Sequence, residues 1–301
     1  MLYLPHTFIF ILGLIFGSFL NVLICRYRPE KNIFAYQNVE GRSHCPYCGK
    51  TLRFFELVPI FSFLFQGGRC RNCRHPLSLQ YPIIELLSGI IFLSVPLFLS
   101  KFYFVLNFFR PPFDAPLWFY GLVLVWIAAL LTLILIAAID LRHYLIPDEL
   151  NKVLLILACS HIFFLFWAGK SLPLFGTSFL KQYILLFSPT QNLFLNHLLG
   201  AATAFFFFWL VVFLSRGKAM GFGDVKMAFV VGLLFGWPDA GLIVVLSFIF
   251  GGIYGAFLIF SGRKKMRDKM PFAPFFVLAA FSTLFFGYQI TYSYFKLFGI
   301  S

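Results

Sequence analysis

Long runs of apolar side chains recur along this chain, and they decide what it can fold into. A helix that spans the hydrocarbon core of a bilayer needs about 20 mostly apolar residues. About eight runs approach or reach that length, at residues 7–24, 82–106, 118–139, 152–168, 193–214, 226–237, 239–260 and 272–292. The sequence therefore predicts an all-α polytopic membrane protein with about eight transmembrane helices.

The sixth run, 226–237, is shorter than a bilayer requires. We expect it to tilt, or to form a broken hairpin with the seventh run through Gly236, Trp237 and Pro238. Irregular backbone at membrane depth is tolerated where it lines a polar cavity. The first run lacks a preceding basic region and a following small-residue cleavage site, so we interpret it as a retained span and not as a removed signal peptide.

Composition and charge agree with a membrane protein. Of 301 residues, 60% are hydrophobic and 12% are charged, which leaves too few charges to cover the surface of a soluble domain. The net charge of +13 could suggest a nucleic-acid partner. However, the basic residues concentrate in segments 25–81, 140–152, 215–226 and 261–271. Cytoplasmic loops carry such an excess, so we expect these segments to face the cytoplasm beside membrane lipid, with no nucleic acid bound.

Segment 25–81 is the one loop large enough to form a small soluble domain. It contains two CxxC pairs, Cys45 with Cys48 and Cys70 with Cys73. Four thiolates at this spacing can close a tetrahedron around one Zn²⁺ ion. Two disulfides or four unrelated thiols are the alternatives, but a cytoplasmic location disfavours disulfides. A structural zinc would supply the folding energy of this zinc-binding loop, and four sulfur ligands would leave no position open for water.

Two aspartates stand at the ends of apolar runs. Asp140 follows run 118–139, and Asp224 precedes run 226–237. A carboxylate at membrane depth costs about 2.5–3.5 kcal/mol on insertion scales, which makes each one a candidate for function. The charge distribution places both on the same side of the membrane. Taken alone, Asp140 could instead be an ordinary residue of a loop that reaches Asp148, and we expect Asp148 to cap the next helix.

A pair of close carboxylates suits an aspartyl protease. Like charges close together cannot both ionise, so one carboxylate takes a proton from water while the other donates to the scissile carbonyl. Asp224 lies in a short glycine-rich motif. Gly221 and Gly223 would allow an extended peptide to approach the backbone closely, and Lys226 could supply positive charge near the site.

Together these motifs resemble the type IV prepilin peptidase family, which are GxGD-type aspartyl proteases that act as leader peptidases and N-methyltransferases. The resemblance covers most of the chain. It is carried by Gly17–Val22, the two CxxC pairs, Tyr81–Leu86 with Gly89, Ile139–Asp140 leading to Ile146–Asp148, and Gly221–Lys226.

This resemblance implies that Asp140 and Asp224 are catalytic. It implies a prepilin or pseudopilin substrate, cut at the cytoplasmic face of a bacterial inner membrane, and methylation of the new N-terminal residue by S-adenosylmethionine. Glu85 and Gly89 match positions tied to methylation. The implied domains are the first transmembrane helix (1–24), the methyltransferase-associated zinc loop (25–81), the second span with an outer loop (82–117), and the peptidase (118–301).

The chain departs from the family pattern mainly in the half associated with methylation. Gln80 stands where the family usually has Arg before Tyr-Pro, and Phe54, Phe55 and Glu56 replace a stretch containing Trp and Asp or Asn. A peptidase without methyltransferase activity is therefore one alternative. An ion-coupled transporter with paired carboxylates is another, although it would be expected to show an internal repeat, and the sequence shows none. A non-catalytic assembly factor is a third, in which both aspartates are dispensable.

Overall fold

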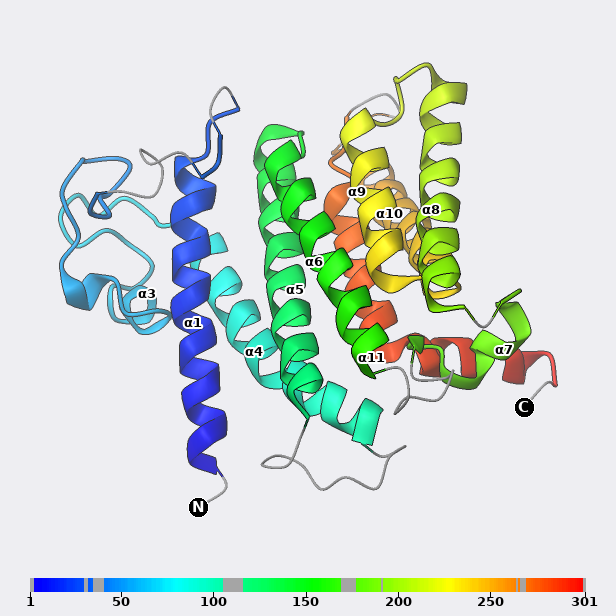
Figure 1. Ribbon diagram of the computed structural model, residues 1–301. Coiled ribbons are helices and arrows are strands. Elements are labelled where there is room, and N and C mark those ends of the chain that lie inside the picture. Colours follow the sequence, from blue (N-terminus) through cyan, green and yellow to red (C-terminus); the bar gives the residue numbers. More distant parts are fainter. Residues whose placement is uncertain are drawn as a thin grey trace. The chain divides into compact units, whose positions relative to one another are not determined.

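The computed structural model describes residues 3–29, 32–34, 41–104, 116–168, 177–190, 192–263, 265 and 269–299 (Figure 1). These residues form helices joined by loops, with two isolated β-bridges in the cysteine loop. The elements are α1 (Tyr3–Arg26), η1 (Phe54–Glu56), α3 (Phe61–Phe65), α4 (Gln80–Phe104), α5 (Leu117–His143), α6 (Asp148–Ala168), η3 (Lys181–Tyr183), α7 (Ile184–Phe187), α8 (Leu193–Ser215), α9 (Phe222–Phe235), α10 (Asp239–Phe260) and α11 (Ala273–Leu297).

The described residues contain seven helices that are long and apolar enough to cross a membrane: α1, α4, α5, α6, α8, α10 and α11. The all-α membrane fold is thereby confirmed. The remaining predicted span is the sixth run, 226–237, which corresponds to α9, a helix of only 14 residues. At 1.5 Å per residue it is about 21 Å long, shorter than the roughly 30 Å hydrocarbon core.

The predicted broken hairpin is present. Helix α9 ends at Phe235, and Gly236 follows with a φ of 77°, a left-handed value that favours glycine. After Trp237 and Pro238 the chain turns directly into α10 at Asp239. Most of the predicted outer loop, at 105–115, and the start of the connector after α6, at 169–176, lie outside the described residues.

The chain divides into two compact units, 1–97 and 98–301, so the division falls inside α4 and earlier than the predicted boundary at 117. In the first unit, α1 and α4 pack through glycines. A Cβ atom on Gly17 would lie 2.7 Å from the Cα of Glu85, and one on Gly13 would lie 2.8 Å from the Cα of Gly89. Small residues at this spacing let helix backbones approach closely in a membrane. Gly89 therefore has a packing role.

In the second unit, α5 lies against α6 and α11, while α9 lies against α6 and α8. The short helix α9 is thus held between longer ones. A Cβ atom on Gly232 of α9 would lie 2.5 Å from the backbone oxygen of Gly200 on α8. Beside this contact, the backbone N–H of Trp237 donates to the Asn196 carbonyl at 2.9 Å. These contacts fix the C-terminal end of the helix whose other end carries Asp224.

The close approach of α8 and α9 predicts that Gly232→Leu destabilises the second unit. The new side chain would meet backbone, which cannot move aside as a side chain can. We expect a loss of about 1–3 kcal/mol of stability, typical of overpacking, measured as a lower midpoint of thermal unfolding in detergent. Gly252→Leu on α10 is the matched control, because a Cβ atom there meets nothing within 4 Å. Equal shifts for both variants would contradict the packing argument.

Candidate active site and metal cluster

Asp140 lies inside α5 and not in a loop, because the helix continues to His143 before Tyr144 ends it in the left-handed conformation. The interpretation of Asp140 as a loop residue was therefore wrong. Its side chain is 5% exposed. Oδ2 accepts a hydrogen bond of 3.0 Å from the backbone N–H of Ala273, the first residue of α11. The N–H groups in the first turn of a helix lack partners within it, and the helix dipole favours negative charge there.

Asp224 is the third residue of α9, whose N-cap is Gly221. The backbone N–H of Asp224 donates to the Gly221 carbonyl at 3.2 Å, and its side chain is half-buried. A Cβ atom on Gly221 would lie 3.7 Å from Asp224 Oδ2, so the glycine keeps that side of the carboxylate open. A Cβ atom on Gly223 would meet Ile146, in the turn between α5 and α6, at 3.4 Å. The segment from Gly221 to Gly223 therefore packs against the turn that contains Ile146.

The two carboxylates are close enough to interact electrostatically. They come from α5 and α9, helices that both lie against α6. Two neighbouring carboxylates do not readily carry negative charge together, so such a pair tends to hold one proton between its members. The site can therefore offer a proton acceptor and a proton donor at once, which is what general acid–base hydrolysis requires.

An ion pair that the sequence did not indicate lies next to this site. Lys226 Nζ donates to both carboxylate oxygens of Asp148, at 2.8 and 2.9 Å. Asp148 is the first residue of α6 and therefore follows the N-cap position that we predicted for it. Its carboxylate binds Lys226. The positive charge that Lys226 was expected to bring to the site is balanced by Asp148. The pair ties the start of α9 to the start of α6.

The four predicted zinc ligands gather in the first unit. The Sγ atoms of Cys45, Cys48, Cys70 and Cys73 all lie within 4.8 Å of one another. None of the six cysteines, all of them in the described part of the chain, forms a disulfide. The four cysteines are therefore free thiols gathered in one cluster in this structure, not four unrelated side chains.

The two CxxC turns are built alike. The N–H of Gly49 donates to the Cys45 carbonyl at 2.9 Å, and the N–H of Arg74 donates to the Cys70 carbonyl at 2.8 Å. Both residues adopt positive φ, 68° for Gly49 and 56° for Arg74. Each pair of sulfurs is thus presented by the same tight turn, an arrangement that suits tetrahedral coordination by two knuckles.

Electrostatics in the cluster also favour a bound cation. The backbone N–H of Lys50 and the side chain of Asn72 lower the pKa of Cys48 to about 7. For Cys73 the N–H of His75 lowers the pKa, but burial and the three neighbouring sulfurs outweigh it and raise the pKa to about 11. Four crowded thiols cannot all ionise unless a cation offsets their charge. A donor set of four sulfurs fits Zn²⁺.

The two methyltransferase candidates occupy structural positions on α4. Glu85 is 7% exposed, and its Oε2 accepts a hydrogen bond of 2.7 Å from the backbone N–H of Ile60 in the cysteine loop. A Cβ atom on Gly89 would lie 2.7 Å from the ring of Phe10. Glu85 therefore fastens the loop to α4, a contact that the sequence did not reveal.

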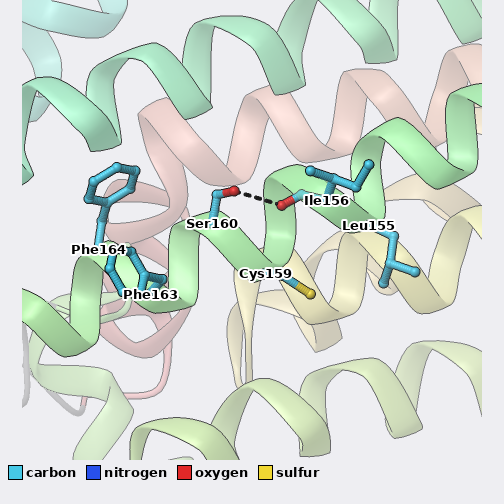
Figure 2. Close-up of a pocket in the computed structure, with 6 residues that line it drawn as sticks. All are labelled: Leu155, Ile156, Cys159, Ser160, Phe163 and Phe164. Carbon is cyan, nitrogen blue, oxygen red and sulfur yellow. Dashed lines mark hydrogen bonds between the residues drawn. The ribbon is translucent and has the colours of Figure 1, made fainter.

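A hollow of about 520 Å³ on the outside of α6 lies apart from these residues (Figure 2). Figure 2 shows that its lining comes from successive turns of this one helix. The hydroxyl of Ser160 donates a hydrogen bond of 2.8 Å to the Ile156 carbonyl in the same helix. Cys159 also lies here and has no part in the thiol cluster. The hollow offers no carboxylate or base, so we interpret it as lipid-facing surface. It is lined by Leu155, Ile156, Cys159, Ser160, Phe163 and Phe164.

Comparisons with known proteins match the chain in two parts, one within residues 1–99 and one within the second unit, 98–301. The family model for the bacterial peptidase A24 N-terminal domain matches residues 11–99, and the model for the type IV leader peptidase family matches residues 126–256. No solved structure matches the chain.

Relatives named prepilin leader peptidase/N-methyltransferase align over nearly the whole chain. The one from Bacillus subtilis is 32% identical, covering 97% of this chain and 98% of its own length. The one from Burkholderia pseudomallei (strain 1026b) is 31% identical, covering 93% of this chain and 85% of its own length. A third, from Pseudomonas aeruginosa, is 27% identical, covering 96% of this chain and 93% of its own length.

The thiol cluster predicts that Cys45→Ser removes bound zinc and unfolds the loop. Three sulfurs would not close a tetrahedron around zinc, and we expect the loop to draw its folding energy from the bound metal. Zinc content measured by atomic emission should fall from one per chain to a small fraction. Amide hydrogen exchange across 41–79 should become fast. Cys159→Ser is the control and should keep the zinc; retention by Cys45→Ser would show that the four-sulfur site is wrong.

The ion pair predicts energetic coupling between α6 and α9. Lys226→Met and Asp148→Asn should each lower the free energy of unfolding, and the double variant should lose little more than either single one. A partly exposed pair of this kind is worth about 0.2–1 kcal/mol in such a cycle. Lys218→Met combined with Asp148→Asn is the control and should be additive. Additivity in the Lys226 cycle as well would mean that the contact has no energetic role.

Proposed function

This chain belongs to the family of prepilin leader peptidases/N-methyltransferases, and from that membership we propose that Asp140 and Asp224 are its catalytic acid pair. The chain is a membrane peptidase with methyltransferase activity. One observation supports this acid pair: the carboxylate of Asp140, in the last turn of α5 and bonded to the start of α11, interacts electrostatically with that of Asp224, in the first turn of α9. Gly221, Gly223 and Lys226 support the site by shaping and anchoring the segment that carries Asp224.

The hydrogen bond to Asp140 restricts where the shared proton can be. A backbone N–H can only donate, so the Asp140 Oδ2 that it contacts acts as the acceptor. The shared proton then belongs to Asp140 Oδ1 or to Asp224. In either state the pair contains one ionised carboxylate and one neutral carboxyl group, as aspartyl hydrolysis requires.

We infer the following sequence for cleavage. The ionised carboxylate takes a proton from water, and the resulting hydroxide attacks the scissile carbonyl carbon. The neutral carboxyl group donates its proton to the carbonyl oxygen, which gives a tetrahedral diol. Collapse of the diol breaks the C–N bond: one diol hydroxyl returns its proton to the carboxylate that had donated one, and the leaving amine receives the proton first taken from water. No covalent bond to the protein forms, and the pair returns to its starting protonation.

The substrate that this family implies is a prepilin or pseudopilin. Its leader would be removed at the cytoplasmic end of its apolar N-terminal helix, which would enter laterally from the membrane lipid. We place the acid pair and the zinc loop on the cytoplasmic face of the bacterial inner membrane, because the segments rich in Lys and Arg lie there by the positive-inside rule. The oligomeric state plays no part in this proposal.

For methylation, S-adenosylmethionine would supply a methyl group from its sulfonium to the new N-terminal amine. We assign this activity to the half that contains the zinc loop (25–81) and α4, with Glu85 and Gly89 as candidates. In the described part of the first unit, Glu85 is the buried carboxylate, and a carboxylate suits a cationic sulfonium. Zinc would be structural, held by the four cysteines. The peptidase would occupy 118–301, with the first span at 1–24 and the second span and its outer loop at 82–117.

The ion-coupled transporter is not favoured, since the relatives and family models all name a peptidase. A peptidase without methylation would differ only in the mass of its product. The measurement of product mass that tests the acid pair therefore also distinguishes a peptidase with methyltransferase activity from one without it.

Replacing Asp140 or Asp224 with Asn should reduce leader cleavage by about 10³-fold or more, because the members of such a catalytic unit act together. Intact-mass analysis of a co-expressed prepilin is the measurement. The unmutated chain should give a product that lacks the leader and carries one added methyl group. Asp239→Asn is the matched control, a buried carboxylate whose Oδ1 accepts from the Phe179 N–H at 3.0 Å.

Three outcomes would change the proposal. Cleavage that persists in either Asp→Asn variant would remove that aspartate from the acid pair. Leader loss without the methyl group would leave a peptidase only. Equal loss in Asp239→Asn would show that the effect reflects membrane insertion and not catalysis.

A further inference from the structure

The loop between α1 and α4 exposes an unusual amount of apolar surface. Over residues 54–65 five large side chains, here called the aromatic rim, are more than half exposed, and exposed apolar patches of this kind usually mark an interaction surface. The rim consists of Phe54 (77% exposed), Phe55 (80%), Phe61 (56%), Leu64 (66%) and Phe65 (87%).

The segment that carries the rim is tied to α4 near the start of this candidate span. The backbone N–H of Ile60, directly before α3, donates to Glu85 Oε2 at 2.7 Å. Glu85 lies five residues inside α4, which is about 8 Å from its start along the axis. Since α4 is a candidate span, a bond this near its start would keep α3 close to the membrane–water boundary.

A groove of about 840 Å³ opens beside the rim in the same loop. Its walls combine rings of the rim, Phe55, Phe61 and Phe65, with charged side chains. Three of these are exposed guanidinium groups, and one is the carboxylate of Glu56, whose Oε2 accepts from the Arg53 N–H at 2.7 Å. The groove therefore carries a net positive charge and suits an anion. The three arginines are Arg69, Arg71 and Arg74.

The charge decides between possible occupants. S-adenosylmethionine carries two positive groups and one carboxylate, so its net charge opposes that of the groove. A phosphodiester carries one negative charge in a geometry that guanidinium groups bind with two parallel hydrogen bonds. Aromatic side chains are also favoured at the headgroup level of a bilayer.

We propose that the aromatic rim and the arginine groove form a site for anionic phospholipid at the membrane surface. The rings enter the boundary between headgroups and acyl chains, while Arg69, Arg71 and Arg74 bind lipid phosphates. The loop is then held by lipid as well as by its two flanking spans. The proposal does not depend on the catalytic roles of the aspartates.

The test is photocrosslinking of the full chain in nanodiscs containing equal amounts of phosphatidylglycerol and phosphatidylcholine. Phe65→benzoylphenylalanine places a reactive group on the rim. Tyr47→benzoylphenylalanine, at a 61% exposed aromatic position outside the rim, is the matched control. Intact mass after illumination should show lipid adducts at position 65 and few at position 47. Phosphatidylglycerol should exceed phosphatidylcholine roughly fivefold, the effect of one basic residue at such a surface.

A second variant tests the groove. A triple variant combines Arg69→Gln, Arg71→Gln and Arg74→Gln. It should give equal amounts of phosphatidylglycerol and phosphatidylcholine adducts at position 65. Arg42→Gln, outside the groove, should leave the ratio of these two lipid adducts unchanged. Zinc content shows that each variant is folded. Asp224→Asn should crosslink like the unmutated chain, so a failure of the peptidase assignment does not affect the result.

Three results would overturn the proposal. Equal lipid labelling at positions 65 and 47 would mean that the rim does not meet the bilayer. Adducts with a co-reconstituted prepilin in place of lipid would make the rim a substrate surface. Loss of the phosphatidylglycerol preference on adding S-adenosylmethionine would assign the groove to the methyl donor.

Discussion

The contact on which the candidate active site depends is that between a buried carboxylate and the start of a helix. The N–H of Ala273, at the beginning of α11, donates to Asp140. The other aspartates of the second unit whose positions are described follow the same rule, since Asp148, Asp224 and Asp239 each lie in the first turn of their own helix. A carboxylate is costly at membrane depth, and the unsatisfied N–H groups and dipole of a helix start offset part of that cost.

This constraint explains why so many helices meet near the site. To place two carboxylates together, the fold brings the end of α5 next to the starts of α9 and α11. The glycine contact between Gly200 and Gly232 then fixes the far end of α9, and the ion pair between Asp148 and Lys226 fixes its near end. Neither contact involves the side chains of Asp140 or Asp224, but both determine where Asp224 lies.

Much of this arrangement is visible in the sequence, because apolar runs and short-range spacing report local structure. The spans agree with the observed helices to within a few residues, and the CxxC spacing correctly indicated the four-sulfur cluster. We predicted that the helix would end at 139, but α5 continues to His143. Tyr144 ends it in the left-handed conformation, a position where the sequence usually has glycine or asparagine. The bonds from Ile60 to Glu85 and from Lys226 to Asp148 join residues far apart in the chain, and no local pattern encodes them.

The shortness of α9 has a consequence for the supply of water. Its 14 residues span about 21 Å, so it leaves roughly 9 Å of the hydrocarbon core uncrossed. Polar backbone must fill that gap, at the glycine motif before the helix or at the turn after it, and such backbone needs hydration or protein partners. In the mechanism proposed for Asp140 and Asp224, which consumes one water per cleavage, such hydrated backbone would give water a route to the carboxylates without a continuous pore.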